Sequence, residues 1–306
     1  MHVSGTKDET IGFIGLGAMG KGMAANCVRK GFKLIVHDIR PEPVAELVKL
    51  GARAAADVTS LARDCSIIIT VLPTGKEVAQ LVIDAGGILD HARPGSVVMD
   101  LSTIDPETTD RLHETARKKG LSAVDAPIGR LAWHAERGES LFMVGAEDKD
   151  FARVKPLLEA MGNTIHHCGK GGTGTRTKLI NNYLAITSCQ LNAEALALTQ
   201  RFGLDLGKTL DVVHGTTATN GQLKINFPIK VLAGDTAPGF TIDLAHKDLS
   251  LIVQAANAAR LPMPLAASAR EAFSTARARG FGGQDFSAMA DVLCDLVQAP
   301  RARLKG

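Results

Sequence analysis

The sequence predicts an α/β fold, with a doubly wound, mostly parallel sheet followed by an all-helical second domain. A glycine-rich segment directly follows a short apolar run near the N-terminus. Strand-like runs then alternate with helix-like stretches, a pattern typical of a parallel sheet covered by helices on both faces. Beyond about residue 175 the strand-like runs end and only helical segments remain.

The glycine-rich segment has the surroundings that dinucleotide binding needs. Residues 11–14 are typical of a buried strand, and Gly15-Leu16-Gly17-Ala18-Met19-Gly20 leads from them into a helix-like stretch over residues 21–29. A second strand-like run, residues 33–37, ends at Asp38. Strand, glycines, helix, strand and acidic residue in this order indicate a Rossmann-type domain. The alternative is a glycine-rich turn without a ligand.

Each residue of this segment has an expected role at the cofactor. Gly15 allows a tight turn, Gly17 lets a pyrophosphate approach the backbone, and Gly20 lets the helix pack against the sheet. The N–H groups at the helix N-terminus would face the phosphates. Asp38, 18 residues after Gly20, suits a ribose 2′-hydroxyl and would repel a 2′-phosphate. The sequence therefore predicts NAD(H), although Arg40 leaves NADP(H) open.

The remaining patterns give the domain organisation. We expect further strands near residues 66–72, 95–100, 122–127 and 141–145, because β-branched runs are typical of strands buried on both faces. Helices are expected over residues 178–202, 206–215, 240–259 and 266–279. The predicted domains are residues 11–171, which bind NAD, and residues 172–306, joined through a long helix at about residues 175–202.

Composition and charge narrow the class of protein. The 306 residues suffice for two domains, and 45% hydrophobic with 22% charged residues is ordinary for a soluble globular protein. The net charge of +3 is too small to indicate nucleic-acid binding, and no run approaches the roughly 18 apolar residues of a membrane span. We therefore expect neither nucleic acid nor a membrane as a partner.

The cysteines indicate neither a disulfide framework nor a metal site. They are odd in number, far apart and without a C-x-x-C pair, which is typical of a protein of the reducing cytoplasm. Cys189 falls in an apolar helix-like run, where a core position is favoured over a nucleophile. The five cysteines are Cys27, Cys65, Cys168, Cys189 and Cys294.

Lys178 and Asn182 are the first candidates for chemistry. They are four residues apart on the long predicted helix, so they share one face. Polar groups in so apolar a helix are costly to bury without partners, which a cleft would explain. A desolvated lysine there would have a lowered pKa and could exchange a proton. The alternative is a lysine that snorkels at a helix start.

Two further cations are candidates for binding an anion. Arg130 follows Gly129 just past a predicted strand, and its guanidinium suits a carboxylate, phosphate or sulfonate. Lys247 lies in a charged cluster over residues 243–248. The alternative for both is an ordinary solvated surface position.

These segments together resemble the β-hydroxyacid dehydrogenase family, also called the 3-hydroxyisobutyrate dehydrogenase family, over about residues 11–295. The resemblance implies that Lys178 is the catalytic acid/base and that Asn182 helps to hold the substrate oxygen. It implies that Ala18 and Met19 present backbone to the pyrophosphate, that Leu72 and Thr103 lie against the cofactor, and that Lys247 closes over it. The substrate-binding residues would be Gly129, Arg130, Asn181, Asn182 and Tyr183. The motifs that carry the resemblance are Gly12-Phe13-Ile14-Gly15-Leu16-Gly17-Ala18-Met19-Gly20, Asp100-Leu101-Ser102-Thr103, Asp125-Ala126-Pro127, Gly171-Gly172-Thr173-Gly174, Lys178-Leu179-Ile180-Asn181-Asn182 and Ala245-His246-Lys247-Asp248.

One departure from the commoner family pattern concerns the substrate. After Asp-Ala-Pro the family often has an apolar residue and Ser-Gly-Gly, which binds a carboxylate, but here Ile128 is followed by Gly129-Arg130. This variant resembles the branch that reduces sulfolactaldehyde, in which the arginine meets the anionic end of the substrate. A sulfonate suits a cationic fork with backbone N–H groups. Leu131, Ala132 and Trp133 differ from the small or hydroxyl residues that often follow in that branch.

We therefore expect NADH-dependent reduction of a short anionic aldehyde, with sulfolactaldehyde as the first choice and Lys178 as the proton donor. The alternative within this class is a 4-hydroxybutyrate or 3-hydroxyisobutyrate type dehydrogenase, acting on carboxylates such as succinic semialdehyde. A different alternative is an NAD-binding interaction module without catalysis. The apolar helical half and the resemblance imply a homodimer or homotetramer in which the long helix contributes to the interface.

Overall fold

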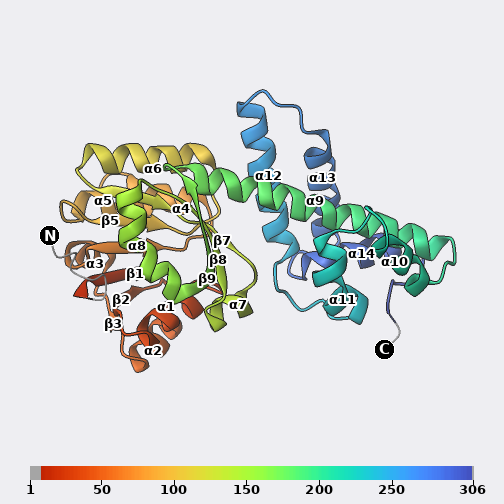
Figure 1. Ribbon diagram of the computed structural model, residues 1–306, viewed down its shortest axis with the longest axis horizontal. Helices are drawn as coiled ribbons and strands as arrows, with labels where there is room; N and C mark the ends of the chain where they lie inside the picture. The colour runs from red at the N-terminus through yellow and green to blue at the C-terminus, as the bar shows by residue number, and fades with distance from the viewer. Residues whose placement is uncertain (1–7, 305–306) are drawn as a thin grey trace. The chain divides into compact units, whose positions relative to one another are not determined.

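The computed structural model describes residues 8–304, and the chain divides into two compact units, one ending at Lys178 and the other beginning at Leu179. The first unit is a sheet layered with helices, and the second consists of helices (Figure 1). This architecture confirms the predicted fold class. The division falls inside the long helix α9 (Thr173–Arg201), whereas the sequence predicts the domain boundary just before that helix, between residues 171 and 172.

The sheet of the first unit has the strand order β3-β2-β1-β4-β5-β6-β8-β7, with β9 added beside β8. From β3 to β6 neighbouring strands are parallel, β8 is antiparallel to β6 and β7, and β9 is parallel to β8. The order reverses between β1 and β4, which is where open α/β sheets bind ligands. The strands are β1 (Thr10–Ile14), β2 (Lys33–His37), β3 (Arg53–Ala54), β4 (Ile67–Thr70), β5 (Val97–Asp100), β6 (Ser122–Asp125), β7 (Ile128–Gly129), β8 (Ser140–Gly145) and β9 (Gly162–Gly169).

The central strands are buried on both faces because their side chains alternate between two apolar layers. Ile67 and Ile69 of β4 belong to one core, which includes Met23 of α1 (Gly20–Arg29). Ile68 belongs to the other core, which includes Leu112 of α6 (Pro106–Lys118). Burial on both faces explains why continuous apolar runs, rather than alternating ones, predict these strands correctly.

Some helices of the first unit begin at a capping side chain. Asp105 accepts the Thr108 N–H at 2.7 Å, and Pro106 occupies the first turn of α6, an arrangement that favours a helix start. Asp57 caps α3 (Val58–Asp64) in the same way. The other helices of this unit are α2 (Pro41–Lys49), α4 (Gly75–Val78), which continues as a π-helix over Ala79–Ile83, α5 (Ile88–His91), α7 (Ala132–Arg137) and α8 (Asp148–Met161).

The second unit packs the greater part of α9 against shorter helices around one apolar core. Phe227, Leu249 and Phe273 are fully buried in that core. The predicted helices in this unit are confirmed, and in the described residues beyond 178 the only β-type pairing is an isolated bridge between Thr241 and Asp285. The helices are α10 (Leu206–His214), α11 (Phe227–Ile229), α12 (Ile242–Ala258), α13 (Pro264–Ala278) and α14 (Met289–Leu296), with a π-helix at Gln222–Asn226 and 3-10 turns at Val231–Ala233 and Phe286–Ala288.

Two further findings concern residues 8–304 as a whole. None of their helices combines the length and the apolar character needed to cross a lipid bilayer. All five cysteines are free thiols, and Cys189 is buried, where burial raises the pKa of its thiol well above the ordinary value. A core position for Cys189 is therefore confirmed.

Candidate active site

The glycine-rich turn between β1 and α1 is tight at both ends and open in the middle. A Cβ on Gly15 would lie 2.1 Å from the carbonyl oxygen of Val71, and one on Gly20 would lie 1.9 Å from that of Gly15. A Cβ on Gly17 would meet no described atom within 4 Å. The φ of Gly15 is +92°, which favours glycine. With Ala18 and Met19 leading into α1, these residues fit a pyrophosphate at the helix N-terminus.

Asp38 directly follows β2, and both of its carboxylate oxygens are engaged. Oδ2 accepts the Leu16 N–H at 2.6 Å, and Oδ1 accepts the Arg40 N–H at 2.9 Å and its Nε–H at 3.3 Å. Burial by itself would raise the pKa of Asp38, but these hydrogen bonds and the charge of Arg40 hold it below its ordinary value. An ionised carboxylate with a guanidinium beside it therefore stands at the end of the second strand.

The carboxyl ends of β4, β5 and β6 carry a row of polar side chains, Thr70, Asp100 and Asp125, which we call the polar row. Its members are register partners across the three strands. Thr70 Oγ1 donates to Asp100 Oδ1 at 2.7 Å, and Ser102 Oγ donates to the same oxygen at 2.6 Å. Asp100 is 2% exposed, and burial raises its pKa to about 6. The polar row is therefore a buried hydrogen-bonded network at the carboxyl ends of the central strands.

Ser102, which donates to Asp100 of the polar row, lies next to the two residues predicted to lie against the cofactor. The Leu72 N–H donates to Ser102 Oγ at 2.8 Å, and Thr103 directly follows Ser102. Leu72 and Thr103 thus leave two adjacent parallel strands, β4 and β5, at their carboxyl ends. Because β1, β4 and β5 are parallel, these carboxyl ends lie on the same side of the sheet as the reversal between β1 and β4, where a ligand is expected.

Lys178 and Asn182 lie about one turn apart on α9, with 8% and 5% of their surfaces exposed. Asn182 Nδ2 donates to Asp248 Oδ2 at 2.6 Å, and Asn182 Oδ1 accepts from Asn181 Nδ2 at 3.0 Å. Lys247 Nζ forms an ion pair with Asp248 Oδ1 at 3.1 Å. The second unit thus gathers three predicted site residues, Asn181, Asn182 and Lys247, around the buried carboxylate of Asp248.

Arg130 follows β7 and has a left-handed backbone conformation, which residues other than glycine rarely adopt. Its φ is +72°, which costs a residue other than glycine about 1–2 kcal/mol. Its exposed guanidinium donates to the Glu139 carbonyl at 2.5 Å, to Asn163 Oδ1 at 2.7 Å and to Thr164 Oγ1 at 2.9 Å. A Cβ on Gly129 would lie 3.1 Å from Leu141. Strain of this kind clusters at functional positions, and the three hydrogen bonds fix the direction of the guanidinium.

Asp100, Ser102 and Asp248 are further polar residues of the candidate site that the sequence motifs contain but do not distinguish from their neighbours. A polar residue that ends a buried strand was the available signal for Asp100, and a carboxylate next to Lys247 was the signal for Asp248. Tyr183 is half-buried and packs against the core of the second unit. The described residues contain no group of three His, Cys, Asp or Glu side chains that could hold a metal ion.

Comparison with known proteins gives a consistent result. Residues 10–169 match the family of the NAD-binding domain of 6-phosphogluconate dehydrogenase, and residues 172–293 match the NAD-binding domain of NADP-dependent 3-hydroxyisobutyrate dehydrogenase. The chain is 42% identical to 3-sulfolactaldehyde reductase of Escherichia coli, over 91% of this chain and 94% of that protein. It is 36% identical to 3-hydroxyisobutyrate dehydrogenase of Pseudomonas aeruginosa, over 86% and 91% of the two chains. Among solved structures, 3-hydroxyisobutyrate dehydrogenase of Mycobacterium tuberculosis with L-serine has a TM-score of 0.85 at 29% identity, covering 93% of this chain and 99% of its own.

Replacing Asp100 by asparagine should change how stability depends on pH. The pKa of Asp100 rises from an ordinary value near 3.8 to about 6 on folding, so the folded protein binds a proton that the unfolded chain releases between these values. Stability therefore falls as the pH rises from about 4 to 6, by about 3 kcal/mol, and the cost is fully present above pH 6. Asp100→Asn keeps the acceptor oxygen for Thr70 and Ser102 but has no charge to bury.

The measurement is denaturant unfolding of both proteins between pH 4 and 8, followed by the fluorescence of Trp133, the only tryptophan in the chain. The free energy of unfolding of Asp100→Asn minus that of the natural protein should rise with pH and level off near pH 7. The exposed Asp57 serves as a matched control in Asp57→Asn, for which no such rise is expected. A difference that is independent of pH would contradict the burial of an ionised Asp100.

Proposed function

We propose that this protein reduces a short anionic aldehyde with NADH. The chain belongs to the β-hydroxyacid dehydrogenase family, also called the 3-hydroxyisobutyrate dehydrogenase family. It is therefore an oxidoreductase that acts on CH–OH groups with a nicotinamide cofactor. The first candidate substrate is 3-sulfolactaldehyde, and the product is then 2,3-dihydroxypropane-1-sulfonate. The observation that carries this proposal is the 42% identity to 3-sulfolactaldehyde reductase of Escherichia coli along nearly the whole chain.

Lys178 is the proton donor in the proposed reaction. NADH, when bound, would supply the hydride for the aldehyde carbon, so the carbonyl oxygen would need a proton from the protein. Lys178 is 8% exposed and so is largely shielded from bulk water. A positioned general acid of this kind contributes roughly 10²–10⁴-fold to the rate.

Asn182 orients the carbonyl oxygen that Lys178 protonates. The two residues share one face of α9, so one oxygen can be approached by both. The amide nitrogen of Asn182 carries two N–H groups, of which one donates to Asp248 at 2.6 Å. The other N–H donates to the substrate oxygen in this proposal, and Asp248 keeps the amide from flipping.

Arg130 and Gly129 bind the anionic tail. The guanidinium has five N–H groups in a planar fork, and hydrogen bonds to Glu139, Asn163 and Thr164 already restrict its motion. A restrained fork loses less side-chain entropy when it binds an anion. Neutral aldehydes gain nothing from this charge, so the site favours substrates with a sulfonate or a carboxylate.

NADH rather than NADPH is the proposed cofactor because Asp38 follows the second strand. Its pKa is held below the ordinary value, so the carboxylate is ionised and suits a ribose 2′-hydroxyl. Arg40 is the cation that would otherwise meet a 2′-phosphate, and its Nε–H donates to Asp38 Oδ1 at 3.3 Å. The ion pair thus occupies the guanidinium and keeps a negative charge beside the ribose.

A carboxylate substrate is the second candidate within the same chemistry. The relatives include 2-(hydroxymethyl)glutarate dehydrogenase of Eubacterium barkeri, 35% identical over 94% of this chain, and 3-hydroxyisobutyrate dehydrogenases. These names refer to carboxylates, which the guanidinium of Arg130 also suits. Succinic semialdehyde is therefore the matched test substrate against sulfolactaldehyde, and a higher kcat/KM for it would overturn the sulfonate proposal.

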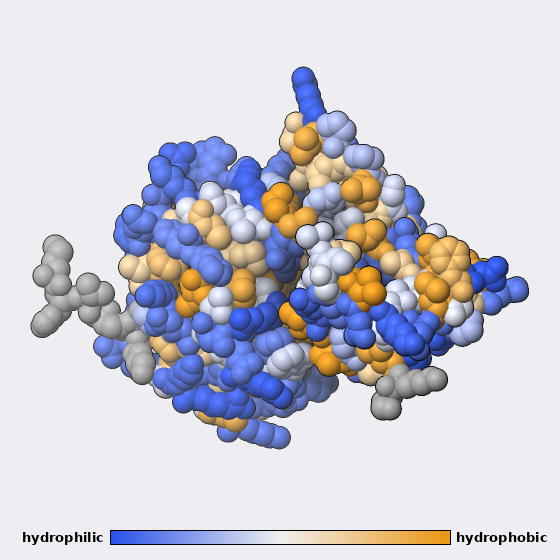
Figure 2. All heavy atoms as spheres, turned by 45° about the vertical axis from the view of Figure 1, so that its right-hand side comes forward, coloured by the Kyte–Doolittle hydropathy of each residue, from blue (hydrophilic) through white to orange (hydrophobic). Residues whose placement is uncertain are grey.

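We also propose a homodimer or homotetramer in the cytoplasm. Ile180, Leu184, Leu191 and Leu198 are 61%, 60%, 61% and 52% exposed along α9, and the last three repeat every seven residues, as in a helix-packing seam. Figure 2 shows further apolar residues on the surface of the helical unit. The cysteines, all free thiols, suit a reducing compartment. Light scattering should give at least twice the 32.2 kDa mass of the chain.

Lys178→Ala should lower kcat by about 10²–10⁴-fold while the affinity for NADH stays nearly unchanged, since the lysine acts in the transition state. The measurement is steady-state NADH oxidation with sulfolactaldehyde and with succinic semialdehyde, alongside NADH binding by fluorescence. The exposed Lys170 provides the matched control Lys170→Ala, which should behave as the natural protein does. An unchanged kcat in Lys178→Ala would refute the role of this lysine.

Arg130→Ala should lower kcat/KM for both anionic aldehydes by about 10–100-fold, the scale of one or two charged hydrogen bonds, and change that for propanal far less. Competition assays with the three aldehydes give the ratios directly. Arg137→Ala removes a nearby exposed cation as the control. Equal losses for charged and neutral aldehydes would place Arg130 outside the substrate site.

Asp38→Ala should shift the cofactor preference toward NADPH by about tenfold or more, because losing one like charge beside a phosphate is worth on the order of 1.4 kcal/mol. The measured quantity is the ratio of kcat/KM for NADH to that for NADPH. In the double variant Asp38→Ala with Arg40→Ala the gain for NADPH should largely vanish, since no guanidinium is left to bind the phosphate. A ratio that does not move in the single variant would mean that Asp38 does not contact the ribose.

A further inference from the structure

The first turn of α9 is capped by a side chain from a distant strand. Asp125, the last residue of β6, is 1% exposed. Its Oδ1 accepts the Gly172 N–H at 2.7 Å, and its Oδ2 accepts the Thr175 N–H at 2.7 Å. Helices leave their first N–H groups without internal partners, and a negative charge there is favourable. One buried carboxylate therefore satisfies two of these groups and pins the helix start to the sheet.

The same turn packs on the sheet with backbone against backbone. A Cβ on Gly174 would lie 2.3 Å from the carbonyl oxygen of Met143 and 2.6 Å from that of Asp125. A Cβ on Gly145 would lie 2.5 Å from Asp125 Oδ1. Glycines at these two positions let α9 approach β6 and β8 without any intervening side chain. The first turn of α9 therefore cannot move closer to the sheet.

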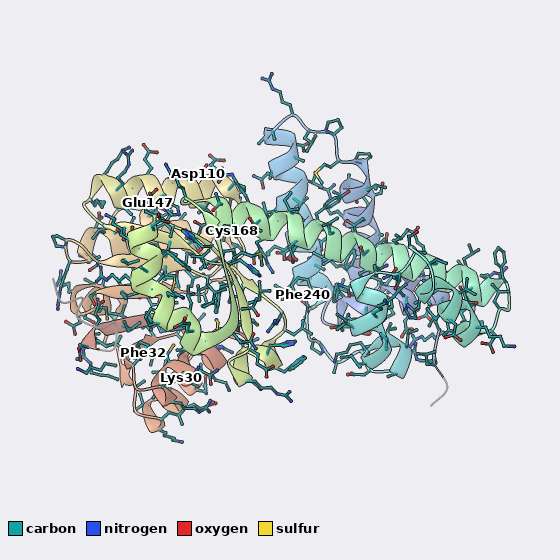
Figure 3. The ribbon with its side chains drawn as sticks, in the orientation of Figure 1. Lys30, Phe32, Asp110, Glu147, Cys168 and Phe240 are labelled. Carbon is teal, nitrogen blue, oxygen red and sulfur yellow. The ribbon has the colours of Figure 1, made fainter. Side chains whose placement is uncertain are left out.

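Helix α6 supports the turn from another side. His113 Nε2 lies 2.9 Å from Asp125 Oδ1, and because this oxygen already accepts the Gly172 N–H, we assign the ring nitrogen as the donor. Asp110 of α6, labelled in Figure 3 beside the start of α9, accepts from Arg176 at 2.9 and 2.8 Å. The hydroxyls of Thr109 and Thr175 are 3.1 Å apart. Three residues of α6 thus form hydrogen bonds that hold the first turn of α9 in place.

We propose that Asp125 and His113 are positioning residues for Lys178, an inference that rests on the proposed role of that lysine. Lys178 lies three residues beyond Thr175 on α9, about 4.5 Å along the helix axis. The position of the Lys178 Cα is set by the first turn of α9. In this proposal the ammonium group reaches the substrate oxygen only from that position. Asp125 acts through α9 and not on the substrate, and His113 acts by holding Asp125. A misplacement of about 1 Å costs an enzyme roughly 10²-fold in rate.

The test combines Asp125→Asn with Lys178→Ala. Asparagine has a single acceptor oxygen and cannot satisfy both backbone N–H groups. We expect kcat to fall about 10–100-fold, with the aldehyde KM and the NADH Kd changed less than about threefold. In the Lys178→Ala background the same substitution should lower kcat no further, because residues that act as one unit are not additive. The assays use sulfolactaldehyde and succinic semialdehyde with the full chain.

Two further variants separate positioning from general stability. His113→Leu should lower kcat severalfold, and His113→Gln should restore most of it, because the glutamine amide can still donate to Asp125. Asp150→Asn is the matched control, since Asp150 is also a buried carboxylate in the first turn of a helix, α8. It should leave kcat within about twofold at a comparable thermal midpoint.

The outcomes distinguish this inference from the proposed function. Full kcat in a folded Asp125→Asn protein, or losses that add to those of Lys178→Ala, would overturn the positioning role. If Asp125→Asn does not fold, equal kcat in His113→Leu and the natural protein would overturn it instead. If Lys178→Ala itself keeps full kcat, the proposed function fails, whatever Asp125 does.

Discussion

Within β4 and β5, which are buried on both faces, the only polar residues are the last ones, Thr70 and Asp100. The polar row of Thr70, Asp100 and Asp125 lies where that burial ends. Two parts of the candidate site are connected to this row. Leu72 is hydrogen-bonded to Ser102, which Thr103 follows, and the first turn of α9 is hydrogen-bonded to Asp125. The edge of the sheet thus provides both the polar groups of the site and the anchors that locate them.

The sequence predicts what depends on local pattern. Gly15, Gly17 and Gly20 identify the turn, and apolar runs identify the central strands, because burial on both faces is visible in consecutive residues. The contacts that fix the candidate site join residues far apart in sequence: Thr175 lies 50 residues after Asp125, and Asp248 lies 66 residues after Asn182. Periodicity carries no information about such pairs. The positive φ of Arg130 also has no signal in its residue type, since the left-handed region favours glycine.

The candidate cations share a common arrangement. Arg40 is paired with Asp38, Lys247 with Asp248, and Arg130 is hydrogen-bonded to the backbone of Glu139 and to two side chains of β9. Each long, flexible side chain is therefore already ordered by the protein itself. Ordering such a chain costs up to about 2 kcal/mol of rotamer entropy, and that cost is met on folding rather than on ligand binding. The carboxylates of Asp38 and Asp248 thus order the side chains of Arg40 and Lys247.

The burial of the cysteines has a practical consequence for experiments in solution. Cys27, Cys65, Cys189 and Cys294 are buried, and Cys168, in β9, is the partly accessible thiol among the five. It lies five residues before the first residue of α9. A maleimide dye would therefore attach selectively to the base of that helix without any engineered cysteine. Trp133, alone of its kind in the chain and in the same unit, offers a natural energy-transfer donor for such a label.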